Sequence, residues 1–213
     1  MLNFKLAIIL SISVVHATEI APHLTNGDTA IITEFPFLVS IQQINVHICG
    51  GSLLSEKWIV SSTRCYLSRS IAELSIEYGS TEITPGLNES NKPRISQIIF
   101  HESYSEPTPL ANDISLIESE SPIVTGFHQP FARLPIPGGS HFNSGTKSVH
   151  AGWGHVQQNV RTNILHKANI NILSFDECVE AVGDTQMPSR NNICAIGDSA
   201  MCAGDLGEVS MNF

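Results

Sequence analysis

The chain has 213 residues, of which 42% are apolar and 15% are charged. This composition is typical of a globular chain with a hydrophobic core and excludes a disordered one, and the length fits one large or two small domains. The formal net charge of −9 at pH 7 argues against nucleic-acid binding, which requires basic patches that displace counterions.

The first residues predict a secretory signal peptide. A positive start at Lys5 is followed by an apolar run over residues 6–15 and by small residues around Ala17, after which we expect cleavage. The run is too short to span a bilayer. We therefore expect a secreted, extracellular chain without a membrane anchor; a buried apolar N-terminal segment is the alternative.

Short apolar runs with β-branched residues recur along the chain and predict strands, because turn residues separate them. In chain order these runs are residues 37–41, 58–60, 71–78, 95–100, 114–117, 148–153 and 168–173. Their rhythm predicts antiparallel β structure, either a barrel or a sandwich.

Residues 174–182 carry a helical pattern. Ser174 and Glu177 have the spacing of a capping box, which occupies the first free amides of a helix, so we expect a short helix here. Residues 122–145 are instead rich in Pro, Gly, His and Ser. This segment is either a crossing between two subdomains or a long surface loop.

Five cysteines in a secreted chain indicate a disulfide framework with one thiol left over. None of their spacings gives the paired Cys-x-x-Cys knuckles of a structural zinc site, so we expect no metal and no cofactor. Asn88 begins an Asn-x-Ser sequon in a polar loop and is a candidate glycosylation site.

Sequence motifs in a fixed order carry the functional argument. They are LTNG at 24–27 with EFPFLVSIQ at 34–42, CGGSLLSEKWIVSSTRC at 49–65, NDISLI at 112–117, GWG at 152–154, and CAGDLGE at 202–208. Each is weak alone, but together they closely resemble the chymotrypsin-like (trypsin-like) serine proteases, peptidase family S1. The resemblance covers nearly the whole chain from Leu24.

The resemblance implies an all-β fold, a chymotrypsin-like double antiparallel β-barrel. It divides the chain into a signal peptide at 1–17, a short pro-segment at 18–23, a first barrel at 24–120, and a crossing with a second barrel at 121–213. The family's last strands and C-terminal helix have no counterpart before Phe213, so we expect an incomplete second barrel. An incomplete gene model or isoform, a different fold of the second half, and a degenerate relic remain open as explanations.

The chemistry of this family requires a serine nucleophile, an imidazole base and a carboxylate that orients the imidazole. By motif the carboxylate is Asp113, whereas Arg64 stands at the base position and Leu206 at the nucleophile position. Leucine has no nucleophilic atom, and a guanidinium stays protonated at physiological pH. The resemblance therefore implies a protease that has lost its chemistry.

Further residues receive roles from the resemblance alone. It implies disulfides Cys49–Cys65 and Cys178–Cys194, which leaves Cys202 unpaired, and it places Ala200 and Gly204 at the substrate-binding pocket. Because His23 precedes Leu24, no trypsin-like activation cut is expected there, and Asp205 loses its usual amino-terminal partner.

Three hypotheses concern replaced or relocated groups. Arg64 either forms a charge-assisted pair with Asp113 or is a neutral replacement on a loop. Ser199 spells a nucleophile tripeptide with the residues before it, but the flanking spacing is wrong. His101 is either a relocated base or, as we favour, a structural or exposed histidine.

The function predicted from these observations is that of a secreted serine protease homologue, a noncatalytic binding or regulatory protein of proteolysis. Its expected partner is a protease, an inhibitor or a cascade component, and neither nucleic acid nor a membrane. One alternative is an active secreted serine endopeptidase that uses Ser199. The other is a nonfunctional or incomplete gene fragment.

Overall fold

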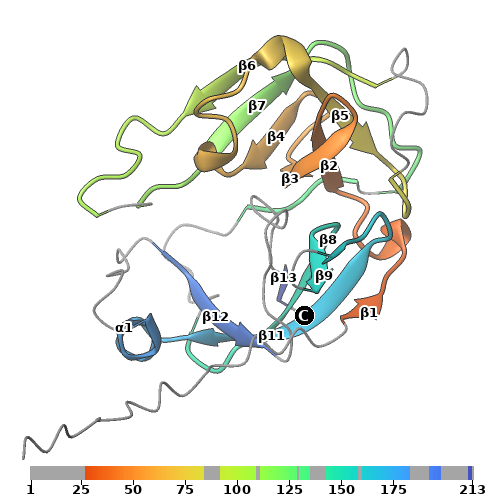
Figure 1. Ribbon diagram of the computed structural model, residues 1–213. Helices are drawn as coiled ribbons and strands as arrows, with labels where there is room; N and C mark the ends of the chain where they lie inside the picture. Colours follow the sequence, from red (N-terminus) through yellow and green to blue (C-terminus); the bar gives the residue numbers. More distant parts are fainter. Residues whose placement is uncertain are drawn as a thin grey trace, which may run out of the picture.

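A computed structural model describes residues 27–83, 92–108, 111–128, 130–134, 143–157, 160–182, 192–197 and 211–212. In these residues strands predominate, with short 3-10 turns and one α-helix. The strands form two main antiparallel sheets, one above the other in Figure 1. No helix within the described ranges is long and apolar enough to cross a membrane.

The first sheet has six strands in the order β5-β2-β3-β4-β7-β6. The strands are β2 (Leu38–Gln43), β3 (Val46–Leu53), β4 (Trp58–Ser61), β5 (Leu74–Tyr78), β6 (Ile95–Phe100) and β7 (Ser115–Ser119). A bridge between Ser75 and Arg94 joins β5 to the residue before β6. The sheet therefore curls back on itself as a barrel (Figure 1).

Side-chain alternation builds the core of this barrel. In β7, Ile117 is 0% exposed while Leu116 is 37% exposed, because successive residues of a strand point to opposite faces. In β2 both faces are buried, so Val39 and Ile41 are 0% exposed along with their neighbours. Gly51 on β3 allows close packing: a Cβ there would lie 2.7 Å from Ile59 Cγ2. Burial of apolar surface contributes roughly 25 cal/mol per Å², so these inward positions supply the main driving force for folding.

The second sheet contains five strands. They are β1 (Asp28–Thr29), β8 (Lys147–Gly152), β11 (His166–Leu173), β12 (Cys194–Gly197) and β13 (Met211–Asn212), beside a separate hairpin of β9 (His155–Gln157) and β10 (Val160–Arg161). β11 pairs with β8 along one edge and with β1 and β12 along the other.

The predicted boundary at residue 120 falls between the strands of the two sheets, with one exception. β1 was assigned to the first barrel by its place in the sequence, but it pairs with β11 through Asp28 opposite Lys167. Lys167 Nζ also forms an ion pair with Glu34, which strengthens this attachment. The first described residues thus cross over to the second half before the chain enters the first sheet.

Thr81 holds the two sheets together. Its carbonyl oxygen accepts hydrogen bonds from the Leu165 amide at 2.9 Å and from Trp153 Nε1 at 3.0 Å, and its hydroxyl accepts one from the Ile32 amide at 3.0 Å. Trp153 is 2% exposed, so the indole N–H would otherwise be buried without a partner. One residue therefore satisfies donors from three segments.

The expected helix is α1 (Phe175–Val182), and it begins with the predicted capping box. The Glu177 amide donates to Ser174 Oγ at 3.2 Å, and the Ser174 amide donates to Glu177 Oε2 at 2.7 Å. Hydrogen bonds from the Ser144 hydroxyl and then from Ser174 lower the pKa of Glu177 to about 2. The Cys178–Cys194 disulfide ties α1 to β12.

The remaining predicted strands lie where the structure has strands, but several of their first and last residues differ. The run 95–100 coincides with β6, whereas residues 71–73 form a 3-10 turn before β5. β3 and β12 were not among the predicted runs. β3 carries two glycines and a cysteine in its interior, which weakens its β-strand pattern.

Candidate active site

The pairing of β4 with β7 brings Arg64 and Asp113 together although 49 residues separate them. Ser61 at the end of β4 lies opposite Ser115 at the start of β7. Beyond this pair, β4 continues into a 3-10 turn, Thr63–Cys65, and Thr63 Oγ1 donates to the Ile114 carbonyl at 2.7 Å. The last ladder pair and this hydrogen bond fix both segments side by side.

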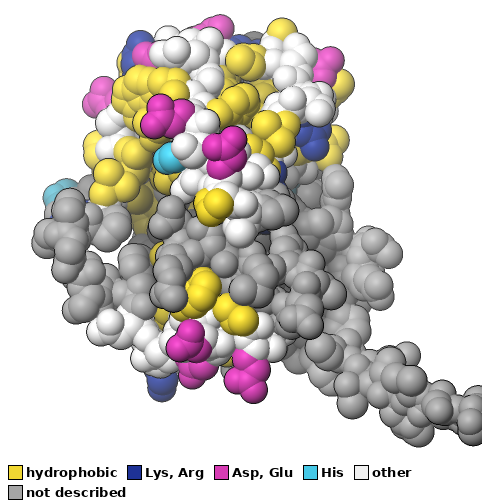
Figure 2. Space-filling model, turned by 90° about the vertical axis from the view of Figure 1, so that its left-hand side faces the viewer, with side chains coloured by type: hydrophobic (Ala, Val, Ile, Leu, Met, Phe, Trp, Pro, Cys, Tyr) yellow, Lys and Arg dark blue, Asp and Glu magenta, His cyan; other side chains and the backbone are white. Residues whose placement is uncertain are grey.

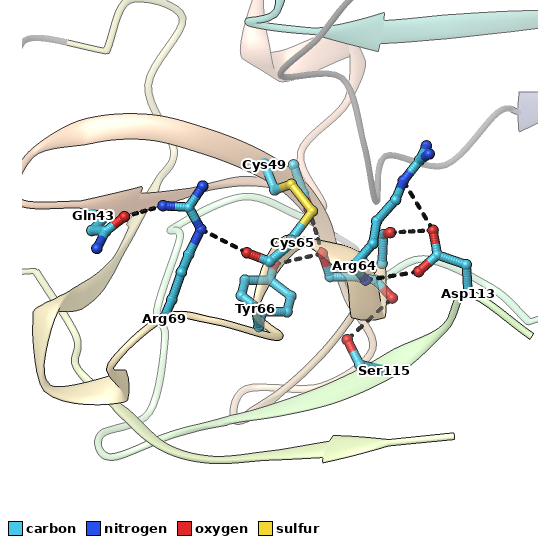
Figure 3. The surroundings of a disulfide bond; sticks show 11 residues. Gln43, Cys49, Arg64, Cys65, Tyr66, Arg69, Asp113 and Ser115 are labelled. Carbon is cyan, nitrogen blue, oxygen red and sulfur yellow. Dashed lines mark hydrogen bonds and ion pairs between the residues drawn. A yellow bond between two sulfur atoms is a disulfide. The ribbon is translucent and has the colours of Figure 1, made fainter. Parts of the chain in front are cut away.

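Asp113 accepts hydrogen bonds on both carboxylate oxygens. The Arg64 amide donates to Oδ1 at 2.9 Å, and Ser62 Oγ donates to Oδ2 at 2.6 Å. Arg64 Nε lies 3.1 Å from Oδ2 (Figure 3). The hypothesis that Arg64 reaches Asp113 is therefore confirmed, and both the main chain and the side chain of Arg64 hold the carboxylate.

A disulfide and a buried tyrosine anchor the turn that carries Arg64. Cys65 is bonded to Cys49 on β3, with their Cα atoms 6.4 Å apart (Figure 3). Tyr66 Oη lies 2.7 Å from Ser61 Oγ, which donates its own proton to the Gly50 carbonyl at 2.7 Å. Tyr66 is therefore the donor in this chain of hydrogen bonds, and burial raises the pKa of its hydroxyl.

Asn112 shapes the opposite side of the site. Its backbone has φ of 55°, a left-handed conformation in which asparagine is enriched. Its side-chain amide donates to the carbonyls of Ser103 and Glu106, each at 3.0 Å. These hydrogen bonds connect two parts of the loop before β7 immediately before Asp113, and they limit the movement of the carboxylate.

In this arrangement a guanidinium and a hydroxyl contact the carboxylate of Asp113. The guanidinium of Arg64 cannot accept a proton from a nucleophile, because it remains a donor at any physiological pH. The side chains of Arg64 and Asp113 are 37% and 15% exposed, and an ion pair this accessible contributes about 0–1 kcal/mol to stability. The main effect of the Arg64 side chain is that it contacts Oδ2 of the Asp113 carboxylate.

His101 and Tyr104 lie in the loop beside this site. His101 is exposed, and its Nδ1 accepts a hydrogen bond from the Ser103 amide at 3.1 Å, so the ring is engaged within its own loop, as a structural role requires. Tyr104 lies close enough to Arg64 and Asp113 for their charges to affect its pKa. Burial and then the charge of Asp113 raise the pKa of Tyr104, while the charge of Arg64 lowers it.

The structure contains both disulfides that the family resemblance implied. Several other predicted site residues lie outside the described residues and remain predictions. They are Leu206 at the nucleophile position, Ser199, Asp205, the pocket positions Ala200 and Gly204, the cysteine Cys202, the sequon residue Asn88 and the pro-segment residue His23.

Sequence reasoning missed Ser62, Tyr104 and Asn112 as parts of this site. Ser62 was visible two residues before Arg64, but its hydroxyl has a partner only when β7 lies beside β4. Asn112 gave a usable signal, because an Asn-Asp pair before a strand is typical of a turn. Nothing in the pattern around Tyr104 indicated its proximity to Asp113.

Two antiparallel sheets, with an aspartate held two residues before the start of β7, agree with the fold of a chymotrypsin-like serine protease. A family model described as Trypsin matches residues 24–208. The chain therefore belongs to the trypsin family of chymotrypsin-like serine proteases, peptidase family S1.

Individual relatives agree with this membership. Mouse (Mus musculus) ovochymase-2 is 30% identical over 81% of this chain, Drosophila erecta trypsin beta is 30% identical over 86%, and Glossina austeni lectizyme is 28% identical over 88%. Among solved structures, neuropsin, a serine protease of mouse brain, matches with a TM-score of 0.72 at 22% identity, covering 88% of this chain and 82% of that one.

The chain spans very different shares of its relatives. The matched region is 29% of mouse ovochymase-2, 70% of lectizyme and 72% of Drosophila erecta trypsin beta. The chain therefore spans less than a third of ovochymase-2 and about 70% of the other two relatives.

Proposed function

We propose that this protein is a secreted, noncatalytic serine protease homologue that acts by binding in the regulation of proteolysis. The observation that carries the proposal is the contact of Arg64 Nε with Asp113 Oδ2 at 3.1 Å. In the triad this carboxylate orients an imidazole that then removes the proton of the nucleophile. Here the guanidinium of Arg64, which stays positively charged at physiological pH, contacts the carboxylate.

The replacement at position 206 supports the same conclusion independently. Leu206 stands where the family motif has the nucleophile, far from Arg64 in the sequence. Two losses in separate motifs are harder to reconcile with catalysis than one. What then remains of the trypsin fold is a scaffold with surface loops, and loops on a rigid scaffold are suited to binding.

Binding partners of the proposed kind are a protease, a protease inhibitor or another component of a proteolytic cascade. The net charge of −9 favours a partner with a basic surface, because complementary charge speeds encounter. Secretion rests on the N-terminal sequence and agrees with the family. An active endopeptidase is the alternative that family membership favours, and it requires a nucleophile other than position 206.

The proposal is tested on the folded protein secreted by a eukaryotic host. The expected result is no hydrolysis of a mixed peptide library above the rate of a matched variant, Asp113→Asn, together with recovery of the protein in complex with a protease or an inhibitor from extracellular fluid of its source. Hydrolysis that the Asp113→Asn variant abolishes would contradict the proposal. Recovery of the protein only as a free monomer would contradict the second part of the proposal, that the protein acts by binding a component of proteolysis.

A further inference from the structure

The segment between the 3-10 turn Thr63–Cys65 and strand β5 forms an exposed loop. All seven residues from 67 to 73 are exposed, without an interruption. Both ends of this run are anchored, because Tyr66 before it is 3% exposed and Leu74 after it is 0% exposed. Exposed loops between anchored elements are preferred sites of proteolytic nicking, since they can open without unfolding the core.

The exposed loop contains an arginine, Arg69, with a serine on each side. The next residues outward, Leu67 and Ile71, are 54% and 38% exposed. A trypsin-type protease takes an arginine side chain into a pocket that contains a carboxylate. Because both neighbours of Arg69 are small, the peptide bond between Arg69 and Ser70 is sterically accessible to such an enzyme.

Most other lysines and arginines of the described ranges lie in more constrained backbone. Arg64 precedes a disulfide-bonded cysteine, and Lys92 precedes a proline, which lacks the N–H and restricts the residue before it. Arg94 forms a β-bridge with Ser75. Arg133 is also exposed in a loop and is the competing site. The remaining ones lie in strands or directly before one: Lys57, Lys147, Arg161 and Lys167.

Gln43 of β2 holds residues on both sides of this peptide bond. Its Oε1 accepts a hydrogen bond from Arg69 Nη1 (Figure 3), and its Nε2 donates to Glu73 Oε2 at 2.6 Å. Arg69 Nε also donates to the Cys65 carbonyl at 2.8 Å. The arginine must leave these acceptors before it can enter a protease pocket. The rate of cleavage therefore depends on how often the loop opens.

Cleavage after Arg69 would leave two pieces that the sheets still join. The first piece contains only the cysteines Cys49 and Cys65, which are bonded to each other, so no disulfide crosses the cut. The ladders of β2 with β5, β4 with β7 and β1 with β11 each have one strand in either piece. The contact of Arg64 with Asp113 also spans the two pieces. The cut molecule therefore keeps its fold.

We infer that the Arg69–Ser70 peptide bond is a limited-proteolysis site for a trypsin-type protease that cleaves after arginine. One water is consumed: the C–N bond breaks, Arg69 gains a carboxylate and Ser70 gains an amino group. Figure 2 shows both acidic and basic side chains on the first barrel, its upper part, so the side in view presents no uniform charge to an approaching protease. The inference goes beyond the proposed function, because it makes this chain a substrate, and it does not depend on loss of catalysis.

The test is a short digestion of the full secreted chain with a low concentration of trypsin, stopped with an inhibitor. The first product is expected to be heavier by one water, and N-terminal sequencing should find a new chain that begins at Ser70. Size-exclusion chromatography in native buffer should show the cut protein at the position of the intact one. Urea without a reductant should then separate the two pieces.

Variants assign the cut to this bond. Ser70 has φ of −78°, which proline can adopt, so Ser70→Pro fits the backbone and is expected to abolish the first cut. Arg69→Gln should do the same and keeps the test decisive if the proline variant does not fold. Gln43→Ala should speed the cut about threefold or more, because the hydrogen bond to Arg69 is lost. The matched control, Arg133→Gln, should leave the rate unchanged.

Four results would overturn the inference. They are resistance of the folded chain to trypsin that cuts its urea-unfolded form, a first cut at another bond such as the one after Arg133, equal rates in wild type and Ser70→Pro, and separation of the pieces in native buffer. A rate unaffected by Gln43→Ala would overturn the part assigned to Gln43. Cleavage without added protease would overturn the proposed function and leave this inference standing, so the two failures are distinguishable.

Discussion

Ser62 Oγ donates a 2.6 Å hydrogen bond to Asp113 Oδ2, the same oxygen that Arg64 Nε approaches at 3.1 Å. A hydroxyl and a guanidinium therefore share one carboxylate oxygen, while the Arg64 amide takes the other. The carboxylate keeps two of its donors when the Arg64 side chain is removed. All three donors lose their acceptor only when Asp113 itself is substituted.

This difference predicts the order of two stability effects. Arg64→Ala is expected to change the free energy of unfolding by at most about 1 kcal/mol, because the pair is accessible to water. Asp113→Ala should cost more, about 1–3 kcal/mol, since the Ser62 hydroxyl and the Arg64 amide then lose their acceptor. Urea unfolding of both variants measures the order. A larger loss in Arg64→Ala would show that the guanidinium, not the carboxylate, organises the site.

The capping box of α1 predicts a pH dependence. The folded-state pKa of Glu177 is lowered from 4.5 to about 2, so the stabilisation is present above the unfolded pKa and is lost as the pH falls from about 4.5 toward 2. Glu177→Gln should remove this part of the pH dependence. Ser144→Ala should reduce it, because the Ser144 hydroxyl is the largest cause of the shift.

The measurement for Glu177 is urea unfolding of wild type and variants at pH 6 and pH 2.5. Ser174→Ala serves as the structural comparison and should cost about 1 kcal/mol at pH 6 through loss of the N-cap. Identical pH dependence in wild type and Glu177→Gln would contradict the role given to this carboxylate.

Tyr66 predicts a loss of stability at alkaline pH. Burial raises the folded-state pKa of its hydroxyl above the ordinary value of 10.0, so the unfolded chain releases this proton first and stability falls as the pH rises above about 10. Tyr66→Phe should lower stability at pH 7 by about 1 kcal/mol through loss of the hydrogen bond to Ser61. It should also make the alkaline decline shallower.

Thermal unfolding at pH 7 and pH 10.5 checks this prediction. Tyr104→Phe is the comparison: partial burial raises the pKa of Tyr104 as well, so this variant should also make the alkaline decline shallower, but by less than Tyr66→Phe. An alkaline decline that persists unchanged in Tyr66→Phe would show that another group is responsible for it.

The sequence was sufficient for features that rest on local chemistry or on family motifs. The capping box at Ser174 and Glu177 follows from spacing along one helix, and the disulfide pairs follow from motif positions. For Arg64 the same motifs left two interpretations open, a pair with Asp113 and a neutral replacement on a loop, and the contact of Arg64 Nε with Asp113 Oδ2 at 3.1 Å decides for the pair.

The remaining features depend on contacts between distant segments. Ser62 donates a hydrogen bond to Asp113 only because β7 lies beside β4. β1 joins the second sheet through backbone pairing, which the pattern of side chains along the sequence does not reveal. The exposure of Leu116 could not be predicted for a different reason. In β7, Leu116 and Ile117 are adjacent apolar residues, and periodicity does not reveal that one faces water.

The most direct test of the central claim is the stoichiometry of fluorophosphonate labelling, by intact mass, on the folded secreted protein, with peptide mapping of any adduct. A fluorophosphonate reacts with a serine only when a base activates it. With Arg64 paired to Asp113 and Leu206 at the nucleophile position, we predict no adduct while an active trypsin labels fully in parallel. A stoichiometric adduct on Ser199, or on any other serine, would contradict the account.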